Sequence, residues 1–137
     1  MTLFVDSSAW FAAANDEDRW NQRAREIIAS RETLVTSDHV LVESWLLIHS
    51  RMHREAAERF WEGLRAGVAR IEKVGPTDLE TAWSIGLLFA DQDFSIVDRT
   101  SFALMERLGL TRAVSFDSDF AVYRYGRNRD RAFELIR

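Results

Sequence analysis

Apolar and polar residues follow one another in short runs and helical repeats that predict a regular succession of strands and helices. Short β-favouring runs predict strands over residues 2–5, 33–36, 69–74, 113–116 and 132–136. Between them, apolar residues three or four positions apart predict helices. The first helix is capped by Ser7 or Ser8 and ends at Ala14. The other helices are expected over residues 16–30, 38–51, 53–67, 77–90 and 95–108.

This alternation predicts an α/β sandwich built on a mainly parallel sheet. No linker, repeat or low-complexity tract divides the chain, and Pro76 indicates a turn before a helix, so residues 1–137 are expected to form a single domain. Parallel sheets bind ligands at the carboxyl ends of their strands. Asp6 and Asp117 each follow a predicted strand directly. The pattern therefore points to chemistry based on carboxylates at that edge.

The composition excludes several classes of protein. Hydrophobic residues make up 47% of the chain and charged residues 29%, which is typical of a soluble globular domain. The N-terminus lacks the basic start and long apolar run of a signal peptide, and no apolar stretch approaches the roughly 20 residues of a membrane span. With no cysteine, the chain has neither disulfides nor thiolate metal ligands. We expect a cytoplasmic protein without membrane contact.

The net charge of −4 does not by itself suggest a nucleic-acid partner. However, all 18 basic residues except Lys73 are arginines, which can hold phosphate with two hydrogen bonds at once. Arg124, Arg127 and Arg129 lie close together near the C-terminus and are candidates for binding RNA phosphates. An arginine-rich composition with a solvated tail explains the same residues. Charge alone leaves the partner open.

Two acids in the first third of the chain have both a structural and a functional interpretation. Asp6 precedes a predicted helix, where aspartate commonly serves as an N-cap. Glu43 has the apolar neighbours Val40, Leu46 and Leu47 at helical spacing. A carboxylate buried among such residues must be paired, protonated or bound to a cation. A buried ion pair and a metal ligand or base are therefore both open for Glu43.

The remaining acids carry similar alternatives. Ser95 and Asp98 match a capping box, in which the acid merely bonds the start of its own helix. Asp117 and Asp119 form a D-x-D pattern after a strand, which suits a divalent cation and is also common in loops. If Asp6, Glu43, Asp98 and Asp117 gather in one cleft, their repulsion favours a cation between them. An all-oxygen site favours Mg²⁺ or Mn²⁺.

Other patterns point less clearly to function. His49 and His53 are four residues apart but lack the surrounding HExxH motif, so a structural pair is the expected interpretation. The five tryptophans fall mostly on apolar helix faces and are expected to pack in the core, with base stacking as the exception. A receiver-type signalling domain also places aspartates at strand ends. It requires an adjacent acidic pair near the first strand, which Asp6 lacks.

Four segments together resemble the PIN-domain nucleases, and among them the VapC-type toxins of bacterial toxin–antitoxin pairs. The segments are Val5-Asp6-Ser7-Ser8-Ala9-Trp10, Val42-Glu43-Ser44, the run from Phe94 to Ala103, and the run from Val114 to Phe120. The resemblance extends over essentially the whole chain. It implies a Rossmann-like three-layer α/β/α sandwich and a metal-dependent endoribonuclease that hydrolyses RNA phosphodiester bonds.

The resemblance also implies a role for particular residues. It makes Asp6, Glu43, Asp98 and Asp117 the catalytic acids around Mg²⁺ or Mn²⁺, with Asp6 and Asp98 as direct ligands. Supporting roles are implied for Asp119, Ser7 and Ser101. Relatives of this type form homodimers and are inhibited by a small antitoxin whose C-terminal segment lies in the active cleft. The alternative is a non-catalytic PIN-like module that binds RNA or protein.

Overall fold

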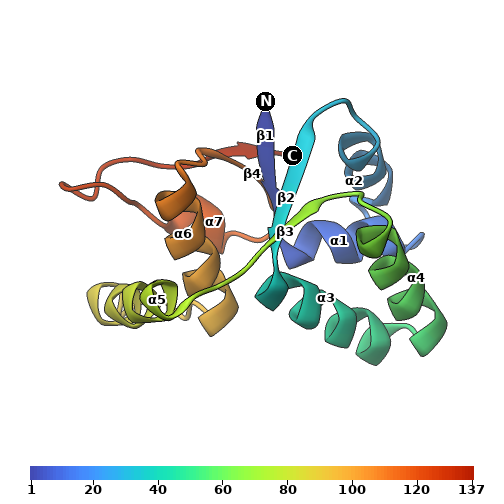
Figure 1. The fold of residues 1–137 in the computed structure, drawn as a ribbon, viewed down its shortest axis with the longest axis horizontal. Helices are drawn as coiled ribbons and strands as arrows, with labels where there is room; N and C mark the ends of the chain where they lie inside the picture. Colours follow the sequence, from blue (N-terminus) through green and yellow to red (C-terminus); the bar gives the residue numbers. More distant parts are fainter.

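Strands and helices alternate through residues 1–137 in the computed structural model of the protein (Figure 1). The five strands are β1 (Thr2–Val5), β2 (Thr33–Ser37), β3 (Arg70–Glu72), β4 (Arg112–Val114) and β5 (Glu134–Ile136). The seven helices are α1 (Ser7–Ala14), α2 (Asn21–Ile28), α3 (Asp38–Arg51), α4 (Arg54–Arg65), α5 (Pro76–Leu88), α6 (Ile96–Leu108) and α7 (Asp119–Val122).

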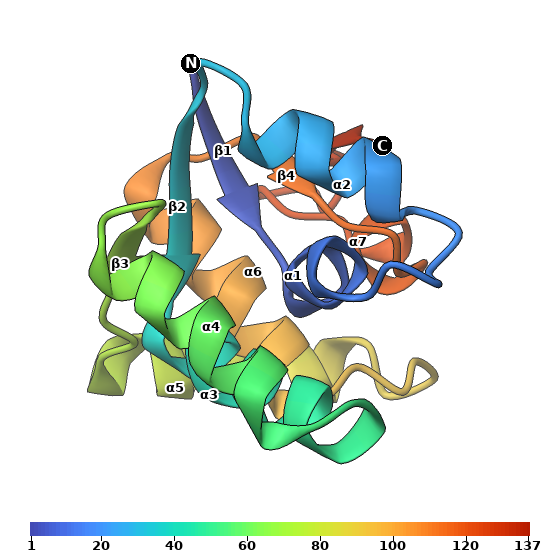
Figure 2. The same ribbon diagram turned by 90° about the vertical axis from the view of Figure 1, so that its right-hand side faces the viewer.

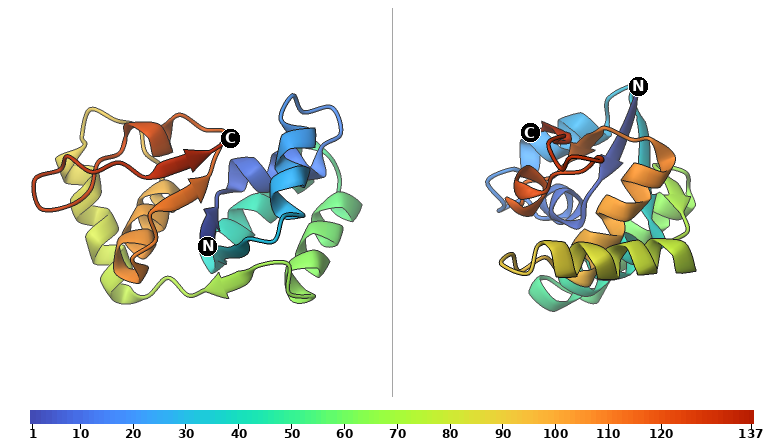
Figure 3. Two further views of the ribbon diagram at one scale, coloured as in Figure 1. Left: turned by 90° about the horizontal axis from the view of Figure 1, so that it is seen from above. Right: turned by 90° about the vertical axis from the view of Figure 1, so that its left-hand side faces the viewer.

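The strands form one sheet in the order β3-β2-β1-β4-β5, and all of its pairings are parallel. In Figure 1 helices α5, α6 and α7 lie on one side of the sheet, and α1, α2 and α4 lie on the other. The view from above in Figure 3 shows the same two groups of helices separated by the strands. The predicted three-layer α/β/α sandwich is confirmed.

The core surrounds the central strand. Leu3, Phe4 and Val5 are at most 1% exposed, because helices cover both faces of β1. This is why β1 is continuously apolar instead of alternating with polar residues. On the α6 side an aromatic cluster fills the space beneath the sheet, with Phe102 stacked on Tyr123 at 4.2 Å between ring centroids. The core therefore holds the carboxyl end of β1, and with it Asp6, in a fixed position.

Several predicted elements differ from the observed ones, and strands β3 and β5 are both shorter than predicted. Residues 16–20 form turns instead of the first part of a helix, because side-chain oxygens compete with the helix for backbone N–H groups. Asn15 Oδ1 accepts from Glu17 N at 3.1 Å, and Asp18 Oδ1 accepts from Trp20 N at 2.8 Å. Helix α2 consequently begins at Asn21. Strand β4 ends at Val114, two residues before the predicted end, and the short helix α7 was not predicted.

The buried acid Asp78 joins helix α5 to helix α6. Its side chain is 3% exposed and forms a two-point ion pair with Arg107, at 2.8 and 3.0 Å. It also accepts from Gly75 N at 2.9 Å, which caps α5. The hydrogen bond from Arg107 lowers the pKa of Asp78 below its usual 3.8. The pair therefore stabilises the fold above that pH, and the contribution is lost as the pH falls through the lowered pKa.

We expect Asp78→Ala to destabilise the protein by about 2 kcal/mol at pH 7, the usual loss for a hydrogen-bonded charged group. The difference from the unsubstituted protein should shrink when both are unfolded in urea near pH 3, because the carboxyl group is then protonated in the unfolded state. Asp93→Ala serves as a control, since Asp93 is exposed and forms no ion pair. A difference that stays constant between pH 7 and pH 3 would show that the ion pair is not its cause.

None of the helices is both long and apolar enough to cross a membrane.

Candidate active site

The sheet topology locates a crevice beside the end of β1. The chain moves from β1 outward to β2 and β3, then crosses over to β4 and β5 on the other side of β1. Neighbouring connections diverge at such a switch point, and ligands bind there at the carboxyl ends of the strands. Asp6 follows β1 at this point, and the Ser115–Asp117 segment follows β4. Helix α3 supplies Glu43 from its second turn, the first turn of α6 supplies Asp98, and α7 begins at Asp119. Figure 2 shows α3 and α6 below the end of β1.

Asp6 is buried and held by hydroxyl groups. Its side chain is 1% exposed, and its Oδ2 accepts hydrogen bonds from Ser8 and Ser115, each at 2.9 Å. It makes no side-chain cap bond to helix α1, so the N-cap interpretation does not explain it. Burial raises the pKa of Asp6 to about 6, against the opposing effect of the two hydroxyl groups. The site therefore fixes a carboxylate without supplying a positive charge for it.

Asp98 forms the predicted capping box and also belongs to the site. Ser95 N donates to its Oδ2 at 3.1 Å, and Asp98 N donates to Ser95 Oγ at 3.0 Å. The two roles are compatible, because the cap occupies one of the carboxylate oxygens. Burial, followed by the nearby Asp119 carboxyl and the charge of Asp6, raises the pKa of Asp98 to about 8. Asp98 thus faces other acids inside the protein.

Glu43 reaches the same site through a serine. Its Oε1 accepts a hydrogen bond from Ser7 Oγ, and Ser7 also lies 3.4 Å from Asp6 Oδ1. The expectation that apolar neighbours bury Glu43 is wrong, since Leu46 is 57% exposed and Glu43 itself is only half-buried. Nor does Glu43 form an ion pair. The negative charge of Glu43 is therefore directed toward Asp6 without a counter-charge.

The D-x-D segment separates into two different positions. The Asp119 carboxyl is near enough to Asp98 to raise the pKa of Asp98. Asp117 lines the cleft but is exposed, and its Oδ1 accepts from Asp119 N at 2.9 Å, which starts helix α7. Of the two acids, Asp119 is the one that raises the pKa of Asp98. The family resemblance implied only a supporting role for Asp119 and a principal one for Asp117.

The other predicted residues lie in different surroundings. Ser7 bridges Asp6 and Glu43, whereas the buried Ser101 hydroxyl forms no hydrogen bond. Arg124 donates to carbonyl groups at the end of α7, and Arg129 lies 3.4 Å from the Tyr123 hydroxyl. Arg127 is exposed on the same segment, which leads back to the start of β5. None of these three arginines lines the cleft.

The histidine pair has structural surroundings. The Nδ1 of His53 accepts from Ala56 N at 3.1 Å and caps helix α4. The His49 ring stacks on Trp45 at 5.0 Å between centroids. Both observations agree with the expectation that the pair does not bind metal.

The acids of the site fit a hard cation by their chemistry. None of Asp6, Glu43, Asp98 and Asp119 has an ion-pair partner. All of the atoms that these four side chains could offer to a metal are carboxylate oxygens. Such crowding is relieved by a divalent cation of the Mg²⁺ type. No three acidic or histidine side chains already converge as a complete ligand set. Mg²⁺ commonly keeps several waters and binds through one or two carboxylates together with substrate phosphate.

The cleft over these acids has a volume of about 510 Å³. Ser7, Ser8, Glu43, Ser95, Asp98 and Asp117 line its polar part. Its walls also carry Trp20 and Phe116 on one side and Arg51 at the end of α3. Sequence reasoning missed these three residues, because their helical spacing or loop position resembles that of ordinary surface and core residues. The cleft is large enough for a nucleotide. Its wall includes a positively charged side chain, Arg51, and the aromatic rings of Trp20 and Phe116.

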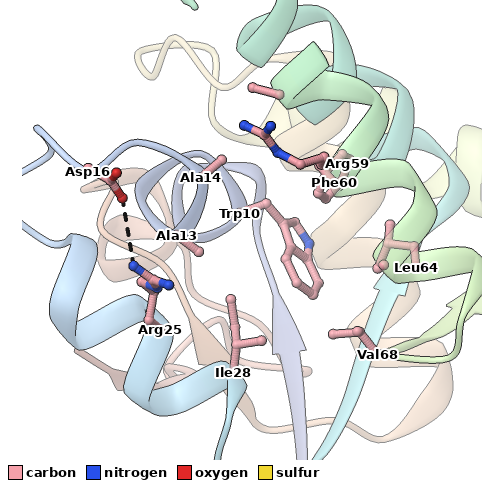
Figure 4. A pocket seen from close by; sticks show the side chains of 12 residues that line it. Trp10, Ala13, Ala14, Asp16, Arg25, Ile28, Arg59, Phe60, Leu64 and Val68 are labelled. Atoms are coloured by element: carbon pink, nitrogen blue, oxygen red, sulfur yellow. Dashed lines mark ion pairs between the residues drawn. The ribbon is translucent and has the colours of Figure 1, made fainter. Parts of the chain in front are cut away.

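A second hollow lies between α1, α2 and α4 and contains no acid cluster (Figure 4). Trp10, Ile28, Phe60 and Leu64 form most of its wall, and an ion pair between Asp16 and Arg25, 3.7 Å apart, lies at its rim. This hollow has an apolar wall and lacks the carboxylates of the cleft. The candidate active site is therefore the cleft at the strand ends and not this hollow.

Residues 3–125 match the PIN domain model. The chain therefore belongs to the PIN-domain family. It is 37% identical over 120 residues to the 23S rRNA-specific endonuclease VapC20 of Mycobacterium tuberculosis, and the alignment covers 87% of this chain and 92% of that relative. The resemblance to VapC-type nucleases is confirmed.

Solved structures agree with this assignment. The crystal structure of M. tuberculosis VapC20, described as a sarcin–ricin loop cleaving toxin, matches with a TM-score of 0.81 at 36% identity and covers 87% of this chain and 92% of its own. FitAcB from Neisseria gonorrhoeae matches with a TM-score of 0.66 at 14% identity, covering 100% of this chain and 97% of its own. VapBC2 from Rickettsia felis, solved with a promoter DNA fragment, matches at 0.59 and 12%, covering 86% and 89%. The last two support the fold alone.

Proposed function

We propose that the protein is an endoribonuclease that depends on Mg²⁺ or Mn²⁺ and acts as the toxin of a toxin–antitoxin pair. The observation that carries the proposal is the pair of buried acids, Asp6 and Asp98, which face each other at the strand ends without any positive partner. A site that raises the pKa of two carboxyl groups in this way is costly unless a cation occupies it. VapC20, an endonuclease by name, supports the same activity.

In this proposal Asp6 and Asp98 hold the metal directly, and Glu43 with Asp117 or Asp119 completes the site, directly or through water. The metal, when bound, lowers the pKa of an attacking water and neutralises charge on the phosphate. Ser8 and Ser115 fix the Asp6 carboxylate by donating to its Oδ2, and Ser95 fixes Asp98. The fixed carboxylates determine which face of the phosphodiester the water can reach. The bond to the 3′ oxygen breaks, leaving a 5′-phosphate.

The substrate that we propose is a structured RNA with an exposed loop. VapC20 is described as cleaving the sarcin–ricin loop, so a hairpin of that sequence is the first substrate to test. Within the cleft, Arg51 is the arginine placed to contact a phosphate. Arg124, Arg127 and Arg129 do not line the cleft, and their contact with RNA phosphates stays a prediction.

The test is cleavage of an end-labelled sarcin–ricin loop hairpin by the purified protein, with Mg²⁺, with Mn²⁺ and with EDTA. We expect discrete cuts that carry 5′-phosphate ends with either metal and no cuts with EDTA. Total bacterial RNA incubated with the purified protein and mapped for new 5′ ends extends the test to other targets. If metal-loaded protein binds RNA but produces no new ends in either substrate, the non-catalytic binding module becomes the better description.

The antitoxin is proposed to place its C-terminal segment in the cleft. The cleft supports this because it is large enough for an extended peptide. Arg51 and the serines Ser7, Ser8 and Ser95 line it and can bind the peptide's polar groups. A peptide copying that segment should compete with the hairpin and raise its apparent KM. A peptide of scrambled order is the control, and equal inhibition by both would contradict a specific fit.

A homodimer is proposed through an apolar face formed by α5, α3 and the start of α6. Its exposed residues are Leu79, Trp83, Leu87, Leu88, Val42, Leu46 and Ile96. Trp83 and Leu87 are each 66% exposed, which is unusual for large apolar side chains on neighbouring helical turns. Large apolar side chains exposed together in this way normally meet a partner. The face is continuous with the cleft at Glu43, beside Val42 and Leu46.

We expect Trp83→Glu to convert the dimer to a monomer, because it places a charge where the proposed interface is dry. Light scattering after size-exclusion chromatography measures the mass. Trp61→Glu is the matched control, since Trp61 is 43% exposed on α4, outside this face. A dimer that persists in the Trp83 variant, or a monomer already in the unsubstituted protein, would exclude this interface.

A further inference from the structure

Three planar groups are layered at one wall of the cleft. The rings of Trp20 and Phe116 stack with their centroids 5.0 Å apart and their planes within 4° of parallel. The Arg19 guanidinium lies over Trp20, 4.8 Å from its ring centroid. Both aromatic residues line the same cleft as Glu43, Asp98 and Asp117. An aromatic platform thus stands beside the acids that hold the proposed metal.

The platform is attached rigidly to the metal site. Phe116 follows Ser115, whose hydroxyl binds Asp6, and Phe116 N donates to Ser8 Oγ at 2.9 Å. Ser8 in turn donates to Asp6 Oδ2, the same oxygen that accepts from Ser115. Phe116 is therefore the immediate neighbour in sequence of Ser115, which fixes the Asp6 carboxylate. Anything stacked on this pair therefore lies at the wall of the cleft that Glu43 and Asp98 also line.

Trp20 is presented by a turn that replaces the expected helix. Asp18 Oδ1 accepts from Trp20 N at 2.8 Å, so the chain leaves the helical path before Asn21. The turn passes beside the segment that follows β4 (Figure 2), where Trp20 meets Phe116. A continuous helix over residues 16–30 would carry Trp20 on the apolar face that packs into the core. The interruption instead places the ring at the cleft.

Core packing accounts for only part of the arrangement, because Phe116 packs against the edge of the hydrophobic core whereas Trp20 does not belong to it. Trp20 and Phe116 are both half-buried, whereas the aromatic residues of the core, such as Phe102 and Phe120, are completely buried. Arg19 is exposed, and no carboxylate forms an ion pair with it. Its guanidinium therefore covers the outer face of Trp20 without being held there by a counter-charge. A flat apolar face with a movable cationic cover suits a nucleobase, which stacks on aromatic rings and on arginine.

We propose that one unpaired base of the RNA substrate stacks on the outer face of Trp20, between the indole ring and the Arg19 guanidinium. The inference rests on the proposed ribonuclease function and adds a positioning group to it. Phe116 supports the indole from behind and the base lies in front. Because every base has a flat π face, the platform selects an unstacked nucleotide in a loop or single strand and not a particular sequence. A duplex, whose bases are already stacked, is excluded.

The first experiment measures kcat and KM for the sarcin–ricin loop hairpin with single abasic positions introduced along its loop. We expect Trp20→Ala to lower kcat/KM by roughly 5- to 150-fold, the range for loss of one stacked base, mainly through KM. At one abasic position the unsubstituted protein should lose a similar factor, and Trp20→Ala should lose nothing more there. Trp20→Phe should restore most of the activity. Trp61→Ala, an exposed tryptophan outside the cleft, should behave as the unsubstituted protein.

The coupling to one abasic position separates stacking from a structural role, because a misfolded variant would lose activity on every substrate alike. Equal activity of Trp20→Ala and the unsubstituted protein overturns the inference while leaving the nuclease intact. Additive losses at all abasic positions overturn it as well.

A second experiment does not depend on cleavage. Short single-stranded RNAs that carry 2-aminopurine at successive positions are titrated with the Asp98→Asn variant, and stacking is detected as fluorescence quenching. Quenching at one position that disappears with the added Trp20→Ala change supports the platform, even if the hairpin is never cut and the proposed function fails. Absence of quenching at every position, with binding confirmed by filter retention, overturns the platform.

Discussion

Replacing Asp98 by asparagine is expected to reduce RNA cleavage on the order of 1,000-fold while raising the stability of the metal-free protein. Activity falls because the asparagine amide cannot neutralise or hold a divalent cation. Stability rises because the substitution removes a buried carboxylate that faces Asp6 and Asp119. The helix cap survives, since the amide oxygen can still accept from Ser95 N. Loss of activity together with a gain of stability is typical of a group retained for function.

The gain should depend on pH in a defined direction. The pKa of Asp98 is raised from 3.8 to about 8 in the folded protein, so the folded state holds the proton more tightly than the unfolded state does. Stability is therefore lost progressively as the pH rises from about 4 to about 8. The asparagine variant avoids this loss, so its advantage in Tm should be small at pH 4.5 and greatest at pH 8.

Differential scanning calorimetry at these two pH values, with and without Mg²⁺, measures both effects. Mg²⁺ should stabilise the unsubstituted protein and not the variant, because a ligand of the native state raises Tm only where it binds. Asp93→Asn is the control, as Asp93 is exposed and outside the cleft. A variant of Asp98 that is less stable at pH 8 would show that the carboxylate is well compensated, and the metal proposal would lose its main support.

Asp119→Asn is expected to impair cleavage more than Asp117→Asn does, on the order of 100-fold against about 10-fold or less. The two acids are two residues apart, but only Asp119 raises the pKa of Asp98. Asp117 is exposed, and the bond that it makes to Asp119 N can also be made by an asparagine oxygen. The family resemblance alone implies the opposite order, with Asp117 among the four principal acids.

The two variants are matched controls for each other, because each removes one negative charge from the same loop. The measurement is kcat/KM for the hairpin across a Mg²⁺ titration. For Asp119→Asn the Mg²⁺ concentration that gives half of the maximal rate should rise, whereas for Asp117→Asn it should change little. The reverse order of impairment would place Asp117 at the metal and leave Asp119 as a structural contact of Asp98.

Much of the fold follows from local pattern. The strands around Leu3–Val5 and Leu34–Thr36 are continuously apolar or β-branched, and a segment buried on both faces must have this composition. The capping box of Ser95 and Asp98 and the end of α6 at Gly109 are interactions between neighbours in sequence, so they are visible without a structure. The errors occur where side chains compete locally with the helix, as Asn15 and Asp18 do.

The residues that form the site were harder to predict from the sequence than the fold. The sequence placed Asp6 and Asp117 after strands, and the family resemblance added Glu43 and Asp98. The apolar neighbours expected to bury Glu43 do not enclose it, since Val40 is buried but Leu46 is exposed and Glu43 is half-buried. The serine that joins Glu43 to Asp6 was implied only through the family. Nothing in the sequence indicated that Trp20 and Phe116, nearly a hundred residues apart, would stack at the cleft.

By itself the sequence determined the alternation of elements, the parallel sheet and the acids at the strand ends, because these depend on periodicity and on bonds between near neighbours. The tertiary structure alone decided which groups face each other. Asp119 and not Asp117 raises the pKa of Asp98, Arg51 lies in the cleft while Arg124 caps α7, and Trp20 lies on Phe116. Each of these depends on the packing of distant segments and on the direction in which a side chain leaves its backbone. Neither the packing nor the side-chain direction can be predicted from the order of neighbouring residues along the chain.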